Sequence, residues 1–311
     1  MDDRPRCTGS QNCVATRQFA PGCFEPQGHY DKIITMSKRV AAIQMASGPN
    51  VNANLLESGR LIADAVKAGA GLVVLPENFA LMGLAETDKV ELRESPGVGP
   101  MQEFLAQQAD KHDIWLVGGT IPMVLDDPGK VRASCLVFDE QGQQVARYDK
   151  IHLFDVHVVD TDENYVESET IESGDRLVVI DSPFGRLGLS VCYDLRFPEL
   201  YRGLLDEGME VMTLPAAFTA ITGKAHWESL VRARAIENLS YLVAAAQGGY
   251  HINGRETHGD SMIVDPWGTV LDRLPRGSGV VVADINLDRL TSTRRHFPTV
   301  DHRRLRCAYN H

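Results

Sequence analysis

The stretch GLSVCYDLRFPELYR, residues 188–202, joins an expected strand to an expected helix. We expect the strand to cover residues 187–192 and to end at Cys192. The helix is expected over residues 198–207, because Pro198 is of a type favoured at the first helical position. A cysteine at such a strand-to-helix turn can be exposed and activated as a nucleophile. The alternative is a buried structural cysteine.

Strands and helices alternate on both sides of this stretch, with Asn52 as the N-cap candidate of the first helix. Short turn sequences at residues 141–142, 182–185 and 265–268 also indicate hairpins. This mixture favours an α/β fold with a mixed sheet. The expected strands are residues 40–44, 72–75, 114–118, 135–139, 144–148, 177–180, 187–192, 211–214, 242–246, 262–264, 270–271 and 280–285, and the other expected helices are residues 52–68, 99–112 and 226–239.

Two further strand ends carry an ionisable residue. Glu77 follows the strand at residues 72–75, and Lys150 follows the strand at residues 144–148. In α/β proteins, sites are built at strand ends. The alternative for each side chain is a solvated charge. With Cys192, the pair offers an acid/base, a cation and a nucleophile at three strand ends.

The sequence motifs around these three residues resemble those of the nitrilase (carbon–nitrogen hydrolase) superfamily, which uses a Glu–Lys–Cys triad. They are LPENF at 75–79, YDKIHLFD at 148–155 and CYDLRFPELYR at 192–202. The resemblance covers residues 38–304. Segments 214–238, 244–257 and 261–268 resemble the Nit branch. Asp260 is a departure, because relatives usually have His there. We expect it near a strand start, where it alters the pocket edge or dimer detail and little of the chemistry.

The resemblance implies a four-layer α-β-β-α sandwich with two six-stranded sheets, assembled as a homodimer. It implies that Glu77 is the general base and acid, that Cys192 is the nucleophile of a thioester intermediate, and that Lys150 stabilises the oxyanion. The backbone N–H of Tyr193 is a second oxyanion donor. No cofactor and no metal are implied. Glu167 is expected as a supporting second acid that holds Lys150.

Glu169 competes with Glu167 for that role, because ESE offers two carboxylates. Three side chains are expected to bind substrate. Arg196 is four residues after Cys192, close enough to face the pocket. The resemblance adds Phe218 and Thr222. Arg196 suits a substrate carboxylate, Phe218 forms an apolar wall, and Thr222 donates a hydroxyl. The alternative for Arg196 is a structural ion pair with Glu199 or Asp194.

The activity implied is that of a cysteine-dependent amidase. The favoured substrate is deaminated glutathione, hydrolysed to 2-oxoglutarate and Cys-Gly in metabolite repair. The rival is an ω-amidase acting on 2-oxoglutaramate or another small amide. A non-catalytic binding or interaction module on the same fold is a third hypothesis, and the three intact residues argue against it. Transfer of the acyl group to an amine acceptor stays open.

Composition excludes several other classes. The 311 residues include 31 basic and 42 acidic side chains, for a net charge of −11. That charge argues against nucleic acid or anionic membrane as the main partner. No apolar run reaches the roughly 18–20 residues of a membrane helix, and no signal-peptide pattern is visible. We therefore expect a small-molecule amide substrate and a cytoplasmic location.

The two ends of the chain need separate interpretations. Residues 1–35 have no helical or strand period and are expected to be a disordered or non-native extension, whereas residues 36–311 are expected to form a single domain. Three N-terminal cysteines and His29 lack any CxxC pair, which argues against a metal site. The basic residues at 293–296 and 302–304 are expected at the dimer interface or beside acidic helices.

Overall fold

The computed structural model describes residues 38–157 and 164–305. The predictions for residues 1–35, including the N-terminal cysteines and His29, fall outside these ranges. The compact unit that carries the described residues is Thr35–His311. No helix in the described ranges is long and apolar enough to cross a membrane.

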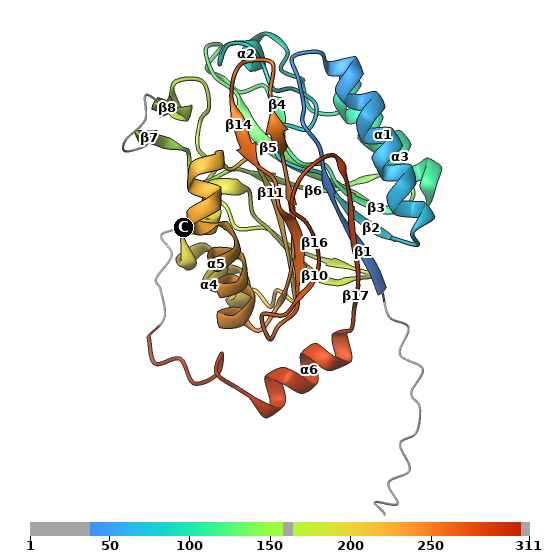
Figure 1. Ribbon diagram of the computed structural model, residues 1–311, viewed down its shortest axis with the longest axis vertical. Helices are drawn as coiled ribbons and strands as arrows, with labels where there is room; N and C mark the ends of the chain where they lie inside the picture. Colours follow the sequence, from blue (N-terminus) through green and yellow to red (C-terminus); the bar gives the residue numbers. More distant parts are fainter. Residues whose placement is uncertain (1–37, 158–163, 306–311) are drawn as a thin grey trace, which may run out of the picture. The chain divides into compact units, whose positions relative to one another are not determined.

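The first sheet has seven strands, one more than the six expected. Strands β1, β2 and β3 are parallel, β17 flanks β1 in antiparallel register, and β6 pairs with β5. Helices α1 (Val51–Lys67) and α3 (Pro100–His112) cover its outer face (Figure 1). In order across the sheet the strands are β17 (Gly279–Ile285), β1 (Lys38–Gln44), β2 (Leu72–Val74), β3 (Trp115–Val117), β5 (Arg132–Phe138) and β4 (Ile121–Met123), with β6 (Gln144–Asp149) beside β5. The sequence pattern missed β4, which is only three residues long.

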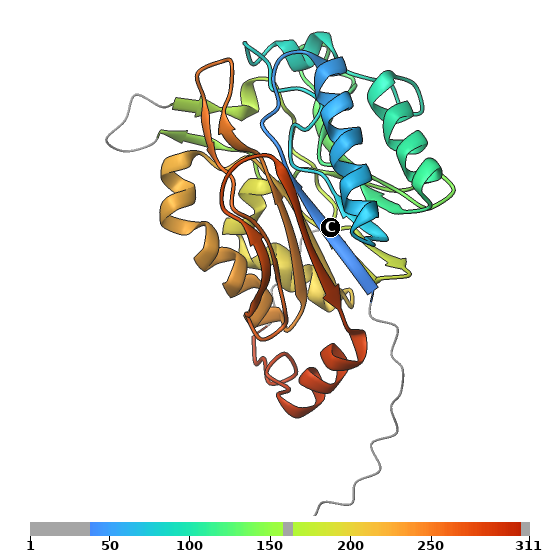
Figure 2. The same ribbon diagram turned by 45° about the vertical axis from the view of Figure 1, so that its right-hand side comes forward.

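The second sheet has six strands, as expected. Strands β10, β11 and β12 are parallel, and β9, β15 and β16 complete the edges in antiparallel pairs. Helices α4 (Pro198–Asp206) and α5 (Ala220–Asn238) cover the outer face (Figure 2). In order across the sheet the strands are β16 (Val270–Leu274), β15 (Ser261–Val264), β12 (Tyr241–Ala246), β11 (Val211–Ala216), β10 (Gly185–Leu189) and β9 (Val179–Ser182).

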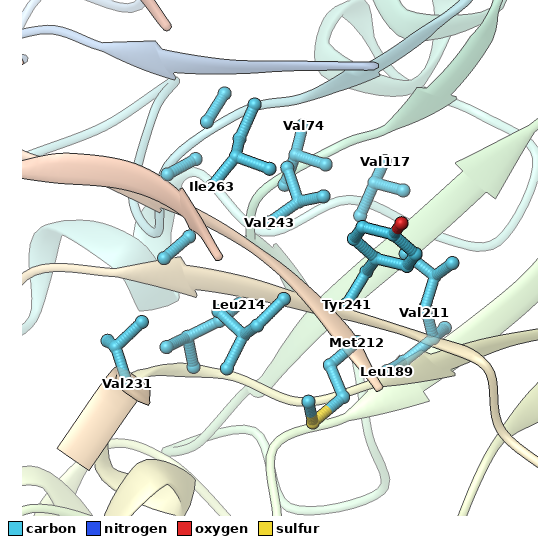
Figure 3. Packing of buried hydrophobic residues seen from close by; sticks show 14 of the residues in the cluster. Val74, Val117, Leu189, Val211, Met212, Leu214, Val231, Tyr241, Val243 and Ile263 are labelled. Carbon is cyan, nitrogen blue, oxygen red and sulfur yellow. The ribbon is translucent and has the colours of Figure 1, made fainter. Parts of the chain in front are cut away.

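The two sheets pack face to face through buried apolar side chains. Val74 and Val117 of the first sheet lie opposite Tyr241 and Val243 of the second (Figure 3). Because successive side chains of a strand alternate between faces, the neighbouring residues of the second sheet point outward; Leu214 lies toward helix α5 (Figure 3). The order is therefore helices, sheet, sheet, helices, which confirms the four-layer sandwich.

Several boundaries differ from the sequence predictions. The strand expected to end at Cys192 ends at Leu189, and a 3₁₀ helix, η2 (Cys192–Arg196), follows. Helix α1 has Asn50 as its N-cap instead of Asn52, because the Asn50 side chain accepts a hydrogen bond from the Ala53 N–H. Helix α5 begins at Ala220, about 1.7 turns before the predicted start at residue 226.

Small elements complete the described chain, and the sequence analysis predicted none of them. Two hairpins stand beside the strand ends that carry the ionisable residues (Figure 2). The elements are α2 (Asp88–Glu91), the hairpin β7 (Asp155–His157) with β8 (Asn164–Val166), η1 (Glu167–Glu169), the hairpin β13 (Gly248–Tyr250) with β14 (Glu256–His258), and α6 (Leu287–His296), which holds the basic residues 293–296.

Candidate active site

Three chain segments bring opposite charges together at one end of the sandwich. The Lys150 Nζ atom lies 2.8 Å from Oε1 of Glu77 and 2.8 Å from each carboxylate oxygen of Glu167. The thiol of Cys192 lines the same pocket as Glu77, and burial and the Glu77 charge both raise the pKa of the thiol. The Lys150 side chain is only 2% exposed. A cation, two carboxylates and a thiol therefore share a site largely shielded from water.

Glu167, and not Glu169, is the second acid that contacts Lys150. Besides the lysine, the Glu167 carboxylate accepts a hydrogen bond of 2.7 Å from the backbone N–H of Phe154. Both acids lie in η1, and Glu169 also lines the pocket. The geometry thus separates two carboxylates that the sequence left in competition.

The backbone around Glu77 is held by a residue that sequence reasoning missed. Gln247, which follows β12, is fully buried. Its amide Nε2 donates to the Glu77 carbonyl oxygen at 3.0 Å and to Ser47 Oγ at 2.7 Å. The available signal was a polar side chain directly after the apolar run of residues 241–246.

Cys192 lies in a left-handed backbone conformation, with φ of 47°. Such a conformation costs a non-glycine residue about 1–3 kcal/mol and persists only where its surroundings impose it. Buried Asp194 supplies that constraint, because its carboxylate accepts hydrogen bonds from the Val191 N–H at 2.8 Å and the Tyr148 hydroxyl at 2.7 Å. It also contacts His152. The cysteine turn is thus fixed to the segment that carries Lys150.

A hydrogen bond reaches the Cys192 sulfur from the residue that follows β11. The backbone N–H of Ala217 donates to Sγ of Cys192 at 3.4 Å. Sequence reasoning did not single out Ala217, which has no functional side chain. Tyr193 follows Cys192 directly and lines the pocket, with its ring packed edge-on against Phe154 and Phe197.

The charges set the protonation states of the site. Burial lowers the pKa of Lys150, but Glu167, Glu77 and Cys192 together raise it well above its ordinary value, so the ammonium stays charged. Burial is the largest single effect and raises the pKa of Glu167, but Lys150, the Phe154 N–H and Lys89 together outweigh it and the net pKa is lowered, so this group stays a carboxylate.

The thiol responds in the other direction. Burial raises the pKa of Cys192, the Glu77 charge raises it further, and the opposing effect of Lys150 is smaller. The net pKa is well above the ordinary value, so the resting group at neutral pH is the neutral thiol. A neutral thiol is a poor nucleophile. A thiol in this state needs a base beside the sulfur before it can react, and Glu77 lines the same pocket.

A pocket of about 250 Å³ opens over the thiol, and all three predicted substrate-binding residues line it. The Arg196 guanidinium carbon lies 5.0 Å from the ring centroid of Phe218, and its NH1 lies 3.1 Å from Nδ1 of His226. The Thr222 hydroxyl lies 2.8 Å from that of Thr219. Arg196 therefore presents its charge at the pocket wall, stacked on an apolar ring.

Asp260 lies next to β15, as expected, but it does not line this pocket. Its carboxylate pairs with Arg273 at 2.6 and 3.0 Å, and its carbonyl oxygen accepts a hydrogen bond from the Trp227 indole. It therefore belongs to a separate charged cluster beside helix α5. Within residues 38–157 and 164–305, no group of three or more His, Cys, Asp or Glu side chains is arranged to hold a metal ion.

A buried acid, cation and thiol thus meet at one pocket of an α-β-β-α sandwich. The family model described as carbon-nitrogen hydrolase matches residues 39–295. The chain belongs to the carbon–nitrogen hydrolase family.

Individual relatives place it more narrowly. It is 46% identical over 266 residues to a deaminated glutathione amidase of Synechocystis, covering 85% of this chain and 97% of the relative. It is 39% identical to the human protein of the same name, with 85% and 82% covered. The crystal structure of Saccharomyces cerevisiae Nit3, a member of branch 10 of the nitrilase superfamily, superimposes with a TM-score of 0.78 at 30% identity, covering 88% and 98%.

Proposed function

We propose that this enzyme is an amidase that hydrolyses deaminated glutathione to 2-oxoglutarate and Cys-Gly. The observation that carries the proposal is the buried cluster of Glu77, Lys150 and Cys192 at the base of a pocket that also holds Arg196. Relatives named deaminated glutathione amidase, similar over 85% of the chain, support the choice of substrate.

Acylation begins with proton transfer from the Cys192 thiol to the Glu77 carboxylate. The sulfur attacks the amide carbon, and the carbonyl oxygen becomes an oxyanion. Lys150 Nζ and the backbone N–H of Tyr193 stabilise this charge, and losing one such donor typically costs about 3–4 kcal/mol of transition-state stabilisation. Glu77 then returns the proton to the amine, the carbon–nitrogen bond breaks, and a thioester is left on Cys192.

Deacylation uses the same groups. Glu77 takes a proton from water, the hydroxide attacks the thioester carbon, and the sulfur leaves and is reprotonated. Glu167 contributes by position: its two oxygens hold Lys150 Nζ between the carboxylates. The lysine therefore keeps its charge and its place through both steps.

Recognition of the acyl half rests on Arg196. A planar guanidinium binds a carboxylate through two parallel hydrogen bonds, and the α-keto acid end of the substrate offers one. The Arg196 guanidinium carbon lies over the Phe218 ring, 5.0 Å from its centroid, in a cation–π contact. Thr222 supplies a hydroxyl at the same wall.

Release of 2-oxoglutarate by the purified protein tests the function. Deaminated glutathione and 2-oxoglutaramate are compared at equal concentrations, with Cys192→Ala as the control. We expect a higher kcat/KM for deaminated glutathione and no turnover in the variant. A preference for 2-oxoglutaramate would change the assignment to ω-amidase, and turnover that survives in Cys192→Ala would remove the mechanism.

The assembly and location expected from the resemblance are part of this proposal. We infer a homodimer in the cytoplasm. Light scattering on the eluted protein measures the mass of the assembly, and a monomer at micromolar concentration would refute the dimer. Cell fractionation with an antibody against the chain tests the location.

A further inference from the structure

A second guanidinium lines the pocket, and the mechanism above does not use it. Arg255 precedes β14 in the β13–β14 hairpin. The hairpin turn is held over the site, because Asn253 Nδ2 donates to the Gly83 carbonyl oxygen at 2.8 Å and Asn253 Oδ1 accepts from the Arg255 N–H at 3.0 Å. The backbone that carries the Arg255 side chain is thus fixed at the pocket.

The Arg255 guanidinium is only partly satisfied by the protein. Its NH2 donates to the Ala217 carbonyl oxygen at 2.9 Å, and its carbon lies 5.1 Å from the ring centroid of Tyr165. Its Nε is buried and has no hydrogen-bond partner among the described residues. A buried unsatisfied donor is costly, and it is uncommon in folded proteins unless it has a specific role.

The two pocket arginines are attached to adjacent residues of one segment. Arg255 donates to Ala217, and Arg196 stacks on Phe218. The N–H of the same Ala217 contacts the Cys192 sulfur. A substrate whose amide carbon lies at Cys192 therefore has guanidinium groups from two separate elements, η2 and the β13–β14 hairpin, within the same pocket.

The other cations of the pocket are already neutralised. Lys150 lies between two carboxylates, and Lys89 Nζ is 2.5 Å from Oε2 of Glu86. Arg255, half-buried beside the Tyr165 ring, is available to a ligand. Its place on a hairpin at the edge of the pocket suits the leaving half of the substrate, because the acyl half is bound at Arg196.

We propose that Arg255 binds a carboxylate at the far end of the leaving group, so that the site selects linear amides with a carboxylate at both ends. The inference rests on the proposed function and refines it. Cys-Gly carries such a carboxylate, whereas the ammonia released from 2-oxoglutaramate does not. Arg255 is thus the residue that separates a dipeptide amide from a small primary amide.

The test compares Arg255→Met with wild type on deaminated glutathione and on its C-terminal carboxamide. Hydrogen bonds to charged groups contribute about 1.5–3 kcal/mol, which is about 10- to 100-fold in kcat/KM. We expect the kcat/KM of wild type to be lower by that factor on the carboxamide than on the acid. We expect the kcat/KM of Arg255→Met on the acid to be lower by the same factor than that of wild type, mainly through a higher KM. The variant is expected to handle acid and carboxamide alike.

Arg196→Met is the matched control. Both substrates share the keto acid end, so this substitution should lower kcat/KM by the same factor for both. A purely structural role of Arg255, through Ala217, would lower kcat on acid and carboxamide by the same factor and would overturn the proposal.

Calorimetry with Cys192→Ala, with and without Arg255→Met, measures binding of the two ligands without turnover. If wild type does not hydrolyse deaminated glutathione, the proposed function fails. The calorimetric preference for acid over carboxamide still decides the role of Arg255: a preference lost with Arg255→Met supports it, and no preference overturns it.

Discussion

Two clusters in this molecule hold one cation between carboxylates, and the two cations differ in their exposure to water. Lys150 is 2% exposed and its cluster includes a thiol. Arg273 is 38% exposed and lies beside helix α5, away from the pocket. The carboxylates are Glu77 and Glu167 for Lys150, and Asp260 and Glu228 for Arg273.

The two clusters differ in how much water reaches their cations. Charges near water interact through a high dielectric and are screened by salt, so an exposed pair contributes little. In a buried site the same charges shift pKa values and stabilise a developing oxyanion. The raised pKa of Cys192 is one such effect, because burial and the Glu77 charge act together on the sulfur. The effect of a charged cluster on pKa values therefore depends less on which charged residues it contains than on their burial and on the thiol beside them.

The largest difference is expected for the same amide substitution in the two clusters. Glu77→Gln removes the general base and is expected to lower kcat/KM by about 10²–10⁴. Glu228→Gln, at a side chain 45% exposed, is expected to change it less than about twofold. Steady-state assays with deaminated glutathione measure both. Equal losses would mean that Glu77 is not the general base.

Removing the cations should separate the clusters in stability. Lys150→Met leaves two buried carboxylates without their partner and is expected to lower the free energy of unfolding by about 3–5 kcal/mol. Arg273→Met is expected to cost less, because it leaves only one buried carboxylate, Asp260, whereas its other partner, Glu228, is 45% exposed. Urea unfolding followed by circular dichroism gives both values. A larger loss for Arg273→Met would reverse the comparison.

The pH dependence of stability should carry a signature of Glu167. Its pKa is below the usual 4.5, because Lys150, the Phe154 N–H and Lys89 together outweigh the effect of burial. The unfolded chain therefore binds this proton at a higher pH than the native protein does. The stabilisation is present above about pH 4.5 and is lost as pH falls toward the lower native pKa. Glu167→Gln should reduce the slope of the unfolding free energy against pH in this range by up to about 1.4 kcal/mol per pH unit. An unchanged slope would contradict the lowered pKa of Glu167.

The smallest effect is expected at Glu169. It lies in the same 3₁₀ helix as Glu167 and lines the pocket, but Glu167 provides both oxygens that contact Lys150. We expect Glu169→Gln to lower kcat less than about threefold and to leave the acid slope of stability unchanged. A loss of kcat as large as that caused by Glu167→Gln would mean that the supporting role does not belong to Glu167 alone.

The alternation of apolar strands and helices predicted much of the fold. The motifs that resemble those of the family located Glu77, Lys150 and Cys192. The end of the strand before Cys192 was wrong, because the left-handed φ of the cysteine comes from contacts of Asp194 with the segment 148–152. No local pattern signals such a turn.

The supporting residues were missed for a related reason. Gln247 acts on Glu77 from 170 positions away in the chain, and Arg255 reaches Ala217 across 38. Their roles exist only once the sheets and hairpins have packed. Backbone groups such as the Ala217 N–H have no side-chain signature at all. Sequence reasoning therefore finds the groups that react better than the groups that hold them.

The protonation state of Cys192 is the most direct test of the central claim, that a neutral buried thiol is activated by Glu77. The rate of Cys192 alkylation by iodoacetamide is measured against pH by peptide mass spectrometry, in wild type and Glu77→Gln. The account predicts a midpoint above the ordinary thiol range in wild type, and a lower midpoint in the variant because one negative charge is gone. A wild-type midpoint at or below neutral pH would contradict it, since a resting thiolate needs no base.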